Sequence, residues 1–302
     1  MGLDSTAELG EFLRSRRARL SPEEAGVPIT GTARRVPGLR REELAHLAGV
    51  STDYYSRLEQ GRHRNVSGGV LDAVSRALRL DEAEHTYLLQ LARPQQHSTR
   101  RTPARPQRVR PGLHRMLETL DSATPAFVVG RGLQVLASNR LARALITDFE
   151  ALPYRERNLA RFIFLDESAR TVYPDWPKVA DETAAVLRLE AGRNCDDGSF
   201  CELIGELAVK SERFRAAWAA HNVIRRSHGS KRYQHPLVGG ITIAYEALRP
   251  QGDTDQTLYV YTTEAGSPSE TALQLLANLT ARVQPSASPL LRTDDTLEIH
   301  LS

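Results

Sequence analysis

The stretch ELAHLAGVSTDYYSRLEQGRHRN, from Glu43 to Asn65, decides the fold of the first part of the chain. Gly49 follows an apolar turn, and Ser51 is a favourable N-cap for a second helix. This pattern of two helices joined by a tight turn is typical of a helix–turn–helix. We therefore expect helices over residues 40–48 and 52–60.

The second of these helices has two different faces. Helical spacing places Tyr55, Leu58 and Glu59 on one side, which should face a helical bundle. The other side would then enter the major groove of DNA. Arg57 is the leading base-reading candidate, because a guanidinium can donate to both O6 and N7 of guanine. The residues of this stretch that we predict to contact DNA are Arg41, Ser51, Thr52, Asp53, Ser56 and Arg57.

The remainder of the first domain is predicted to be helical as well. Residues 6–20, 68–78 and 82–92 show helical patterns, so the fold class expected for residues 1–92 is all-α, with about five helices. The intervening segment 21–38 is longer than a compact bundle requires, and we expect it to be an exposed loop.

Positive charge is concentrated in the front third of the chain. Residues 1–115 carry 20 Arg and Lys against 13 Asp and Glu, whereas the remainder carries 20 against 24. All 20 of those front cations are Arg, and two of them, Arg34 and Arg35, lie in the predicted loop, where they could reach a phosphate backbone. This segregation of charge favours a polyanionic partner such as double-stranded DNA.

Residues 93–112, RPQQHSTRRTPARPQRVRPG, read as a linker between two domains. They contain six Arg, four Pro and no acidic residue, a composition that favours an extended, solvated chain. The same arginines could also make transient contacts with DNA phosphates. No apolar window approaches the roughly 18–20 residues of a membrane span, so we expect a cytoplasmic protein without membrane contact. Cys195 and Cys201 are interpreted as ordinary reduced thiols.

The motifs ELAHLAGVS and YYSRLEQGR resemble those of the XRE, or λ-repressor-like, helix–turn–helix family. The resemblance implies sequence-specific DNA binding. It also implies a structural ion pair between Arg17 and Glu59, and phosphate contacts by the residues after the LE-x-G motif, namely Arg62, His63, Arg64 and Asn65. A helical bundle that binds another protein, without touching DNA, is the alternative interpretation of this region.

The larger half of the chain alternates strand and helix patterns. PAFVVGRGLQVLASN predicts a hairpin, and residues 229–264 predict up to three strands. There Ile241, Ile243 and Tyr245 alternate with Thr242, Ala244 and Glu246. The predicted helices cover residues 139–147, 176–188, 200–224 and 269–279. We expect an α+β domain with an antiparallel sheet over residues 113–283, followed by a tail over residues 284–302.

This half resembles the ligand-binding domain of MmyB-like transcription regulators. The residues that carry the resemblance are FLDESARTVYPDW, HGSKRYQHPLVGGITIAYEAL and LYVYTTEAGSPSETALQLL. The resemblance implies a PAS-like sensor fold of the kind found behind an XRE helix–turn–helix in actinobacterial and related proteins. It further implies a sensor cavity and, as the ligand class, a long-chain fatty acid.

An acyl chain would need an apolar tunnel and a donor for its carboxylate. Phe214, Trp218 and His221 share one helix face and could line such a tunnel with Tyr245 of the sheet. The donor candidates are His228, Lys231, Arg232 and His235. The alternative is that all these side chains belong to the core. The predicted ligand-binding residues are Phe214, Trp218, His221, His228, Lys231, His235 and Tyr245.

Catalytic motifs are missing from the sequence. It contains no GxSxG elbow, glycine-rich phosphate loop or HExxH, and His228 and His235 lack further residues at metal-ligand spacing. We expect neither enzymatic activity nor a metal or cofactor. The function predicted is a homodimeric bacterial transcription regulator controlled by an apolar small molecule. In one alternative the second domain only dimerises or binds a protein partner, and in another the chain is a scaffold that does not bind DNA.

Overall fold

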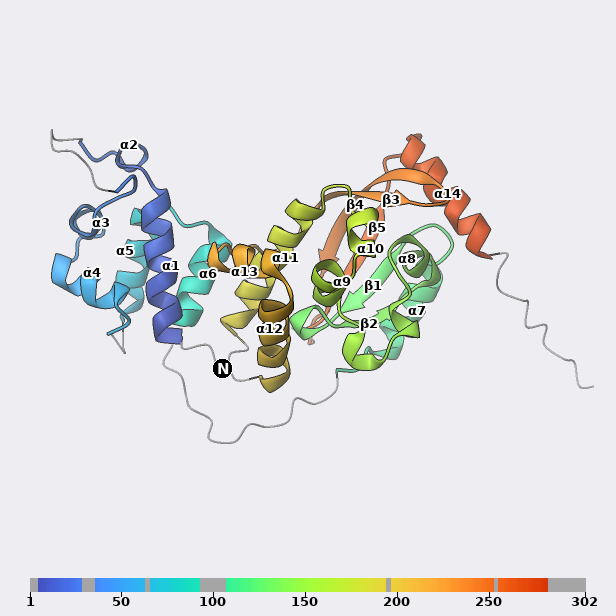
Figure 1. Cartoon of the computed structure of the whole chain (residues 1–302), viewed down its shortest axis with the longest axis horizontal. Helices are drawn as coiled ribbons and strands as arrows, with labels where there is room; N and C mark the ends of the chain where they lie inside the picture. The colour runs from blue at the N-terminus through green and yellow to red at the C-terminus, as the bar shows by residue number, and fades with distance from the viewer. Residues whose placement is uncertain are drawn as a thin grey trace, which may run out of the picture.

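The computed structural model describes residues 5–28, 36–62, 66–92, 107–193, 197–252 and 255–281. Most of the predicted linker and the whole predicted tail lie outside these residues, as do Arg34, Arg35 and Cys195. Figure 1 shows an elongated molecule with a helical domain at one end and an α+β domain at the other. None of the described helices is both long and apolar enough to span a bilayer.

Within its described part, the first domain holds six helices. They are α1 (Ser5–Arg19), α2 (Pro22–Ala25), α3 (Arg41–Leu47), α4 (Thr52–Glu59), α5 (Gly68–Ala77) and α6 (Glu82–Leu91). The prediction of an uninterrupted loop after α1 is wrong at α2. There Ser21 and Glu24 form a capping box, in which each side chain accepts a hydrogen bond from the other residue's backbone N–H. This reciprocal cap stabilises a short helix.

The core of the first domain draws on both halves of the chain. Phe12 of α1 and Tyr87 of α6 are fully buried and meet edge to face, with ring centroids 5.2 Å apart. Leu189 and Val223, which belong to the second half of the sequence, are buried in the same apolar cluster. The two domains are therefore packed together.

Five antiparallel strands form the sheet of the second domain, in the order β2-β1-β5-β4-β3. Their bounds are β1 (Ala126–Val129), β2 (Val135–Ser138), β3 (His228–His235), β4 (Gly239–Leu248) and β5 (Thr257–Thr262). The predicted hairpin and the predicted three later strands are confirmed. Ile241, Ile243 and Tyr245 are buried and alternate with exposed residues, as the period-two pattern predicts.

The helices of this domain are α7 (Pro111–Leu120), α8 (Arg140–Leu145), α9 (Leu159–Leu165), α10 (Ser168–Val172), α11 (Trp176–Ala191), α12 (Gly198–Lys210), α13 (Glu212–Ala219) and α14 (Pro268–Ala281). Short 3₁₀ turns cover Arg131–Leu133, Phe149–Ala151 and Tyr154–Glu156. The prediction of a single helix over residues 200–224 is wrong. The chain is extended at Ser211, whose hydroxyl accepts from the Phe214 N–H and so begins α13.

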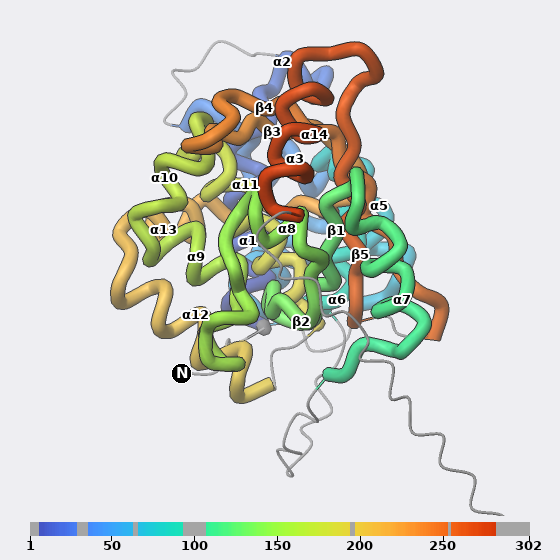
Figure 2. Tube along the Cα trace, turned by 90° about the vertical axis from the view of Figure 1, so that its right-hand side faces the viewer, coloured from blue at the N-terminus to red at the C-terminus, as the bar shows by residue number. Residues whose placement is uncertain are grey.

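The sheet is covered on both faces. Leu113 and Leu117 of α7 pack against Val128 and Leu258 on one face. The aromatic side chains of the other face join a larger core built mainly by α8, α9 and α11. Figure 2, seen along the long axis, shows α8 and α14 in front and the first domain behind them. The result is the α+β domain that the sequence predicts.

Candidate DNA-binding surface and ligand site

The turn between α3 and α4 is built as the motif predicts. Gly49 has a left-handed φ of 65°, which a glycine adopts without steric cost. The Ser51 hydroxyl accepts a hydrogen bond from the Tyr54 N–H at 3.1 Å and so caps α4. Gly61, just after α4, has a φ of 69°, and a Cβ there would lie 2.6 Å from the Thr6 carbonyl. Gly49 therefore shapes the turn, and Gly61 lets the end of α4 pack closely against α1.

One buried carboxylate holds the inner face of α4. Glu59 is only 1% exposed and accepts two hydrogen bonds from Arg17, both at 2.9 Å, which confirms the predicted pair. Arg41 also donates to Glu59, at 3.0 and 3.1 Å. Burial alone would raise the pKa of Glu59, but the hydrogen bonds and charges of Arg17 and Arg41 lower it below its ordinary value.

The outer face of α4 is open. Thr52, Asp53 and Arg57 are exposed, and Ser56 is half-buried. The Nε of Arg57 donates to the Asp53 carbonyl at 3.4 Å, a weak contact that leaves its guanidinium free to reorient. Figure 1 places α3 and α4 at the end of the molecule opposite the sheet, so the second domain leaves this face uncovered.

The other predicted DNA contacts divide into three cases. Arg62 is exposed directly after α4. Arg41 has a side chain 44% exposed, but its guanidinium is bound to Glu59, so its role in this structure is to hold α4. His63, Arg64 and Asn65 lie outside the described residues.

The predicted ligand-binding residues lie in separate places. Phe214 is buried, stacks on Trp218 at 5.3 Å and meets Phe164 edge to face at 5.1 Å. Trp218 is only half-buried. His221 lies beyond the end of α13 with a left-handed φ of 52° and faces α1, away from the sheet. In this structure its ring lies beside Glu8 and Glu11 of α1.

The four predicted ligand-binding residues of the sheet also lie in different places. Lys231 and Tyr245 lie together on the inner face, with the Lys231 Nζ 5.6 Å above the Tyr245 ring. His228 is exposed, and its Nδ1 lies 3.1 Å from the neighbouring Ser227 hydroxyl. The His235 Nε2 lies 3.1 Å from the Ala144 carbonyl, and burial lowers the pKa of this histidine. Of these four residues, Lys231 and Tyr245 are thus the two that lie side by side.

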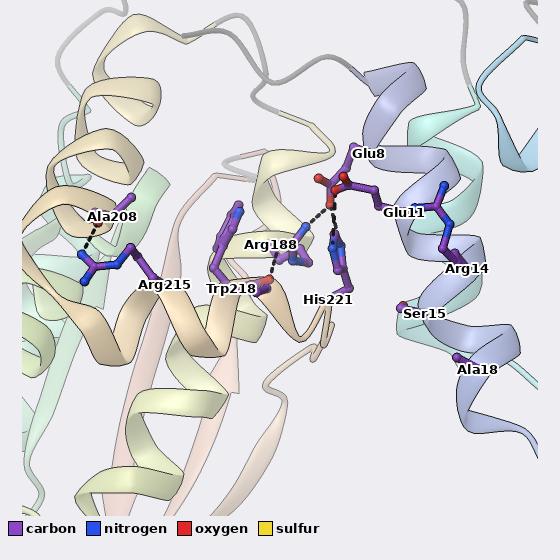
Figure 3. A pocket seen from close by; sticks show the side chains of 11 residues that line it. Glu8, Glu11, Arg14, Ser15, Ala18, Arg188, Ala208, Arg215, Trp218 and His221 are labelled. Atoms are coloured by element: carbon purple, nitrogen blue, oxygen red, sulfur yellow. Dashed lines mark hydrogen bonds and ion pairs between the residues drawn. The ribbon is translucent and has the colours of Figure 1, made fainter. Parts of the chain in front are cut away.

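A polar cluster between the two domains was missed by the sequence reasoning. The Glu8 carboxylate of α1 accepts from Arg188 of α11 and, at 2.8 Å, from the Tyr87 hydroxyl. Arg188 also donates to the Trp218 carbonyl, and its guanidinium lies over the Trp218 ring at 4.2 Å. Figure 3 shows Arg188 between Glu8 and Trp218. This cluster ties the second domain to the first helix of the helical domain.

His221 belongs to the same cluster. Its Nδ1 is 3.4 Å from Glu8 and its Nε2 is 3.5 Å from Glu11. Burial and the positive charges of Arg188 and Arg16 lower the pKa of His221 to about 4. Two carboxylates and an imidazole could in principle bind a cation. Because Arg188 already neutralises Glu8, and His221 is uncharged near neutral pH, we interpret the group as one buried ion pair with a neutral imidazole beside it.

An open pocket of about 600 Å³ adjoins this network. Its lining combines side chains of α1, α11, α12 and α13, among them Arg14, Arg215 and Trp218. The pocket's walls therefore belong to both domains (Figure 3), and any relative movement of the domains would change its shape.

Two known families match separate parts of the chain. The family described as "Helix-turn-helix domain" matches residues 8–88. The family described as "MmyB-like transcription regulator ligand binding domain" matches residues 109–276, which is more than half of the chain. No curated protein matched the sequence. The chain therefore belongs to the MmyB-like transcription regulators, and it joins a DNA-binding helix–turn–helix domain to a ligand-binding domain.

Proposed function

We propose that this protein is a cytoplasmic, sequence-specific bacterial regulator that binds double-stranded DNA as a homodimer and responds to a long-chain fatty acid. Residues 1–92 would bind DNA and residues 113–283 would bind the ligand. One observation carries the proposal: α1 contacts the recognition helix through Arg17 and Glu59, and contacts the ligand-binding domain through Glu8 and Arg188.

The DNA-binding part of the proposal rests on the geometry of α4. The ion pairs of Glu59 fix its inner face, while Thr52, Asp53 and Arg57 remain exposed on the other. A recognition helix of this length covers only a few base pairs. Two protomers on a two-fold symmetric operator would supply the remaining contacts.

The ligand part rests on a continuous line of contacts. Phe164 in the core of the second domain meets Phe214, which stacks on Trp218, and Trp218 lies under Arg188. Arg188 then binds Glu8 on α1. A ligand that moves the aromatic side chains of the core would also move Trp218 and Arg188. The two domains would then adopt a different arrangement. Differential binding to the two arrangements is what couples a ligand to DNA affinity.

The test is duplex binding by the full chain, with DNA from upstream of its own gene and a random duplex as control. Binding is measured at two salt concentrations, with and without hexadecanoic acid. We expect affinity to fall steeply with salt, because several arginines displace counterions. We expect the acid to change specific affinity roughly 5- to 150-fold.

Two results would contradict parts of the proposal. Binding that is insensitive to salt and sequence would favour a scaffold that does not read DNA. Specific binding that ignores the acid would leave the DNA-binding function standing, and would favour a second domain that only dimerises or binds a protein partner.

A further inference from the structure

The two edges of the sheet differ in how their backbone groups are paired. At the β2 edge, the Val135 N–H donates to the Arg157 carbonyl, and Gln134 forms a bridge with Asn158. At the β3 edge, none of the segments that the structure describes pairs with the strand. An unpaired strand edge is a template for a further strand. The β3 edge is therefore the side on which this sheet can grow.

The register of β3 shows which of its backbone groups are unpaired. The Ala247 N–H donates to the Ser227 carbonyl, and in an antiparallel pair every second residue directs its backbone groups to the partner strand. The N–H and C=O groups of Ser230, Arg232 and Gln234 are thus directed away from β4. Within the described part of the chain, these groups have no hydrogen-bond partner. They can accept and donate along one further strand.

A strand pattern is present near the C-terminal end of the sequence. Residues 296–302 read TLEIHLS, so that Leu297, Ile299 and Leu301 alternate with polar residues. Such alternation is typical of a strand with one buried face. The structure describes none of these residues. Their sequence provides one apolar face, which has to be covered, and one polar face, which can meet solvent.

The segment is tethered close enough to reach β3. Arg140, which follows β2, donates to the Ala277 carbonyl of α14 at 3.0 Å, so α14 ends at Ala281 near the β2 side of the sheet. The β3 edge lies about 20 Å away, at roughly 4.8 Å per strand. Residues 282–295 can span roughly 46 Å when extended. A short tether also gives a local concentration in the millimolar range, which favours the chain's own segment over that of a second copy.

The inner side of the β3 edge offers apolar surface. The Tyr173 ring, directly after α10, has its centroid 5.2 Å from that of Tyr233 in β3. Val172 and Trp176, on either side of Tyr173 in the sequence, are only half-buried against the core. Apolar side chains of a sixth strand would cover them and so remove apolar surface from water.

The outer side of the edge is polar. His228, Ser230 and Gln234 are exposed, and the Nε of Arg232 donates to Asp175 at 2.7 Å. The side chains of Arg232 and Asp175 are 61% and 41% exposed, and an ion pair as open as this contributes little to stability. Arg232 can therefore exchange Asp175 for an acid on an incoming strand.

We propose that residues 296–302 bind to the β3 edge of the same chain as a sixth strand. Their backbone groups pair with the groups of β3 that face away from β4. The apolar residues of the segment face inward, toward Val172 and Trp176, and Glu298 pairs with Arg232 on the outer side. The β3 edge is then closed to association with other chains.

Hydrogen exchange of the full chain tests this inference, because a sixth strand would protect the amides of Ser230, Arg232 and Gln234. Exchange at these amides is followed in wild type, Ile299→Asn and His300→Asn. Ile299 belongs to the apolar face of the segment and its neighbour His300 to the polar face, so His300→Asn is the matched control. Thermal unfolding checks that each variant is folded, and the amides of β5 serve as the internal reference.

In wild type the three amides should exchange roughly tenfold slower, or more, than in Ile299→Asn, and His300→Asn should resemble wild type. Fast exchange in wild type would show that the edge is open, and slow exchange retained in Ile299→Asn would show that another segment covers it. Either result overturns the inference. Protection that is lost on dilution, together with a fall from dimer to monomer mass, would assign the strand to a second copy and overturn binding within one chain.

The change of ion-pair partner has its own test. Glu298→Gln should speed exchange of the three β3 amides by about two- to fivefold, the effect expected for one exposed ion pair. Asp175→Asn removes the other carboxylate that can pair with Arg232 and should not speed exchange. Equal effects of the two variants, or an effect of Asp175→Asn alone, would contradict a contact between Glu298 and Arg232.

Discussion

Glu59 shows how one residue fixes the orientation of the recognition helix. Its side chain is inaccessible to solvent, and guanidinium groups from α1 and α3 both donate to it. The three helices that meet at this carboxylate are the ones that must keep their geometry for α4 to face outward. Glu59 acts on DNA binding only through position.

Glu59→Gln should therefore destabilise the first domain by about 3–5 kcal/mol, because it leaves Arg17 buried without its counter-ion. The folded-state pKa of Glu59 is lowered, so its carboxylate contributes stability in full above the ordinary pKa of 4.5 and loses it as pH falls through the folded-state value. Chemical unfolding across acidic pH should show a flatter profile in the variant. Parallel profiles for the two proteins would contradict this role.

Arg57→Ala tests the outer face of the same helix. If Arg57 reads a guanine, the variant should lose roughly 1–3 kcal/mol of discrimination at one base pair, measured on an operator and its single-base variants. Arg62→Ala is the comparison, and it should weaken specific and random duplexes alike, as loss of a phosphate contact does. An equal loss on both duplexes in Arg57→Ala would instead assign Arg57 to the backbone.

The residues differ in how far the sequence could place them. The burial of Tyr55, Leu58 and Glu59 follows from helical spacing, and the Arg17–Glu59 pair from the family motif. The bond from Arg41 to Glu59 was not predicted, because an arginine beside the motif is equally suited to DNA or to a carboxylate. Arg188 and Glu8 are 180 residues apart, and no local pattern records a contact over such a distance.

At the scale of helices and strands, a helix's bounds were predicted correctly where the residues that cap it were recognised. The α4 helix was predicted to within one residue because Ser51 caps it and glycines flank it. The Ser21–Glu24 capping box and the Ser211 break were present in the sequence and were overlooked, since apolar periodicity continues through residues 200–224 in spite of the break. Propensity alone favours one long helix there, but the hydroxyl of Ser211 and its extended backbone divide it.

Ser211→Ala should lower the free energy of unfolding by about 1 kcal/mol, the usual effect of losing an N-cap. The hydroxyl of Ser211 accepts from the Phe214 N–H, and alanine would leave that donor unpaired close to a buried ring. Ser211→Asp, which restores an acceptor, serves as the control. Urea unfolding measures both variants, and equal stability of Ser211→Ala and wild type would show that the cap is dispensable.

At the scale of the whole molecule, the proposed effect of ligand on DNA affinity depends on the contact between the two domains. Glu8→Gln should abolish most of the effect of ligand on DNA affinity, which is roughly 1–3 kcal/mol in an ordinary coupled system, while leaving binding to DNA itself. Glu11→Gln, one turn away on α1 and 55% exposed, is the matched control. Duplex binding with and without hexadecanoic acid measures the effect.

Two outcomes would argue against this role of the junction. An unchanged response to ligand in Glu8→Gln would mean that the domains communicate by another route. An equal loss in Glu11→Gln would mean that any charge change on α1 suffices. Limited proteolysis adds an independent check, because Glu8→Gln should expose the connection around Val223 to cleavage.

The burial of Leu189 and Val223 in the core of the first domain has a consequence for chimaeric regulators. If the chain is divided in the basic segment after residue 92, the helix–turn–helix domain is separated from the second domain. It then also lacks Leu189 and Val223, two side chains of its core. A working exchange of sensors would have to transplant the end of α11 and the segment after α13 along with the DNA-reading helices. In such a chimaera the residues that must be transferred together are those that share the interdomain contact surface, wherever they lie in the sequence.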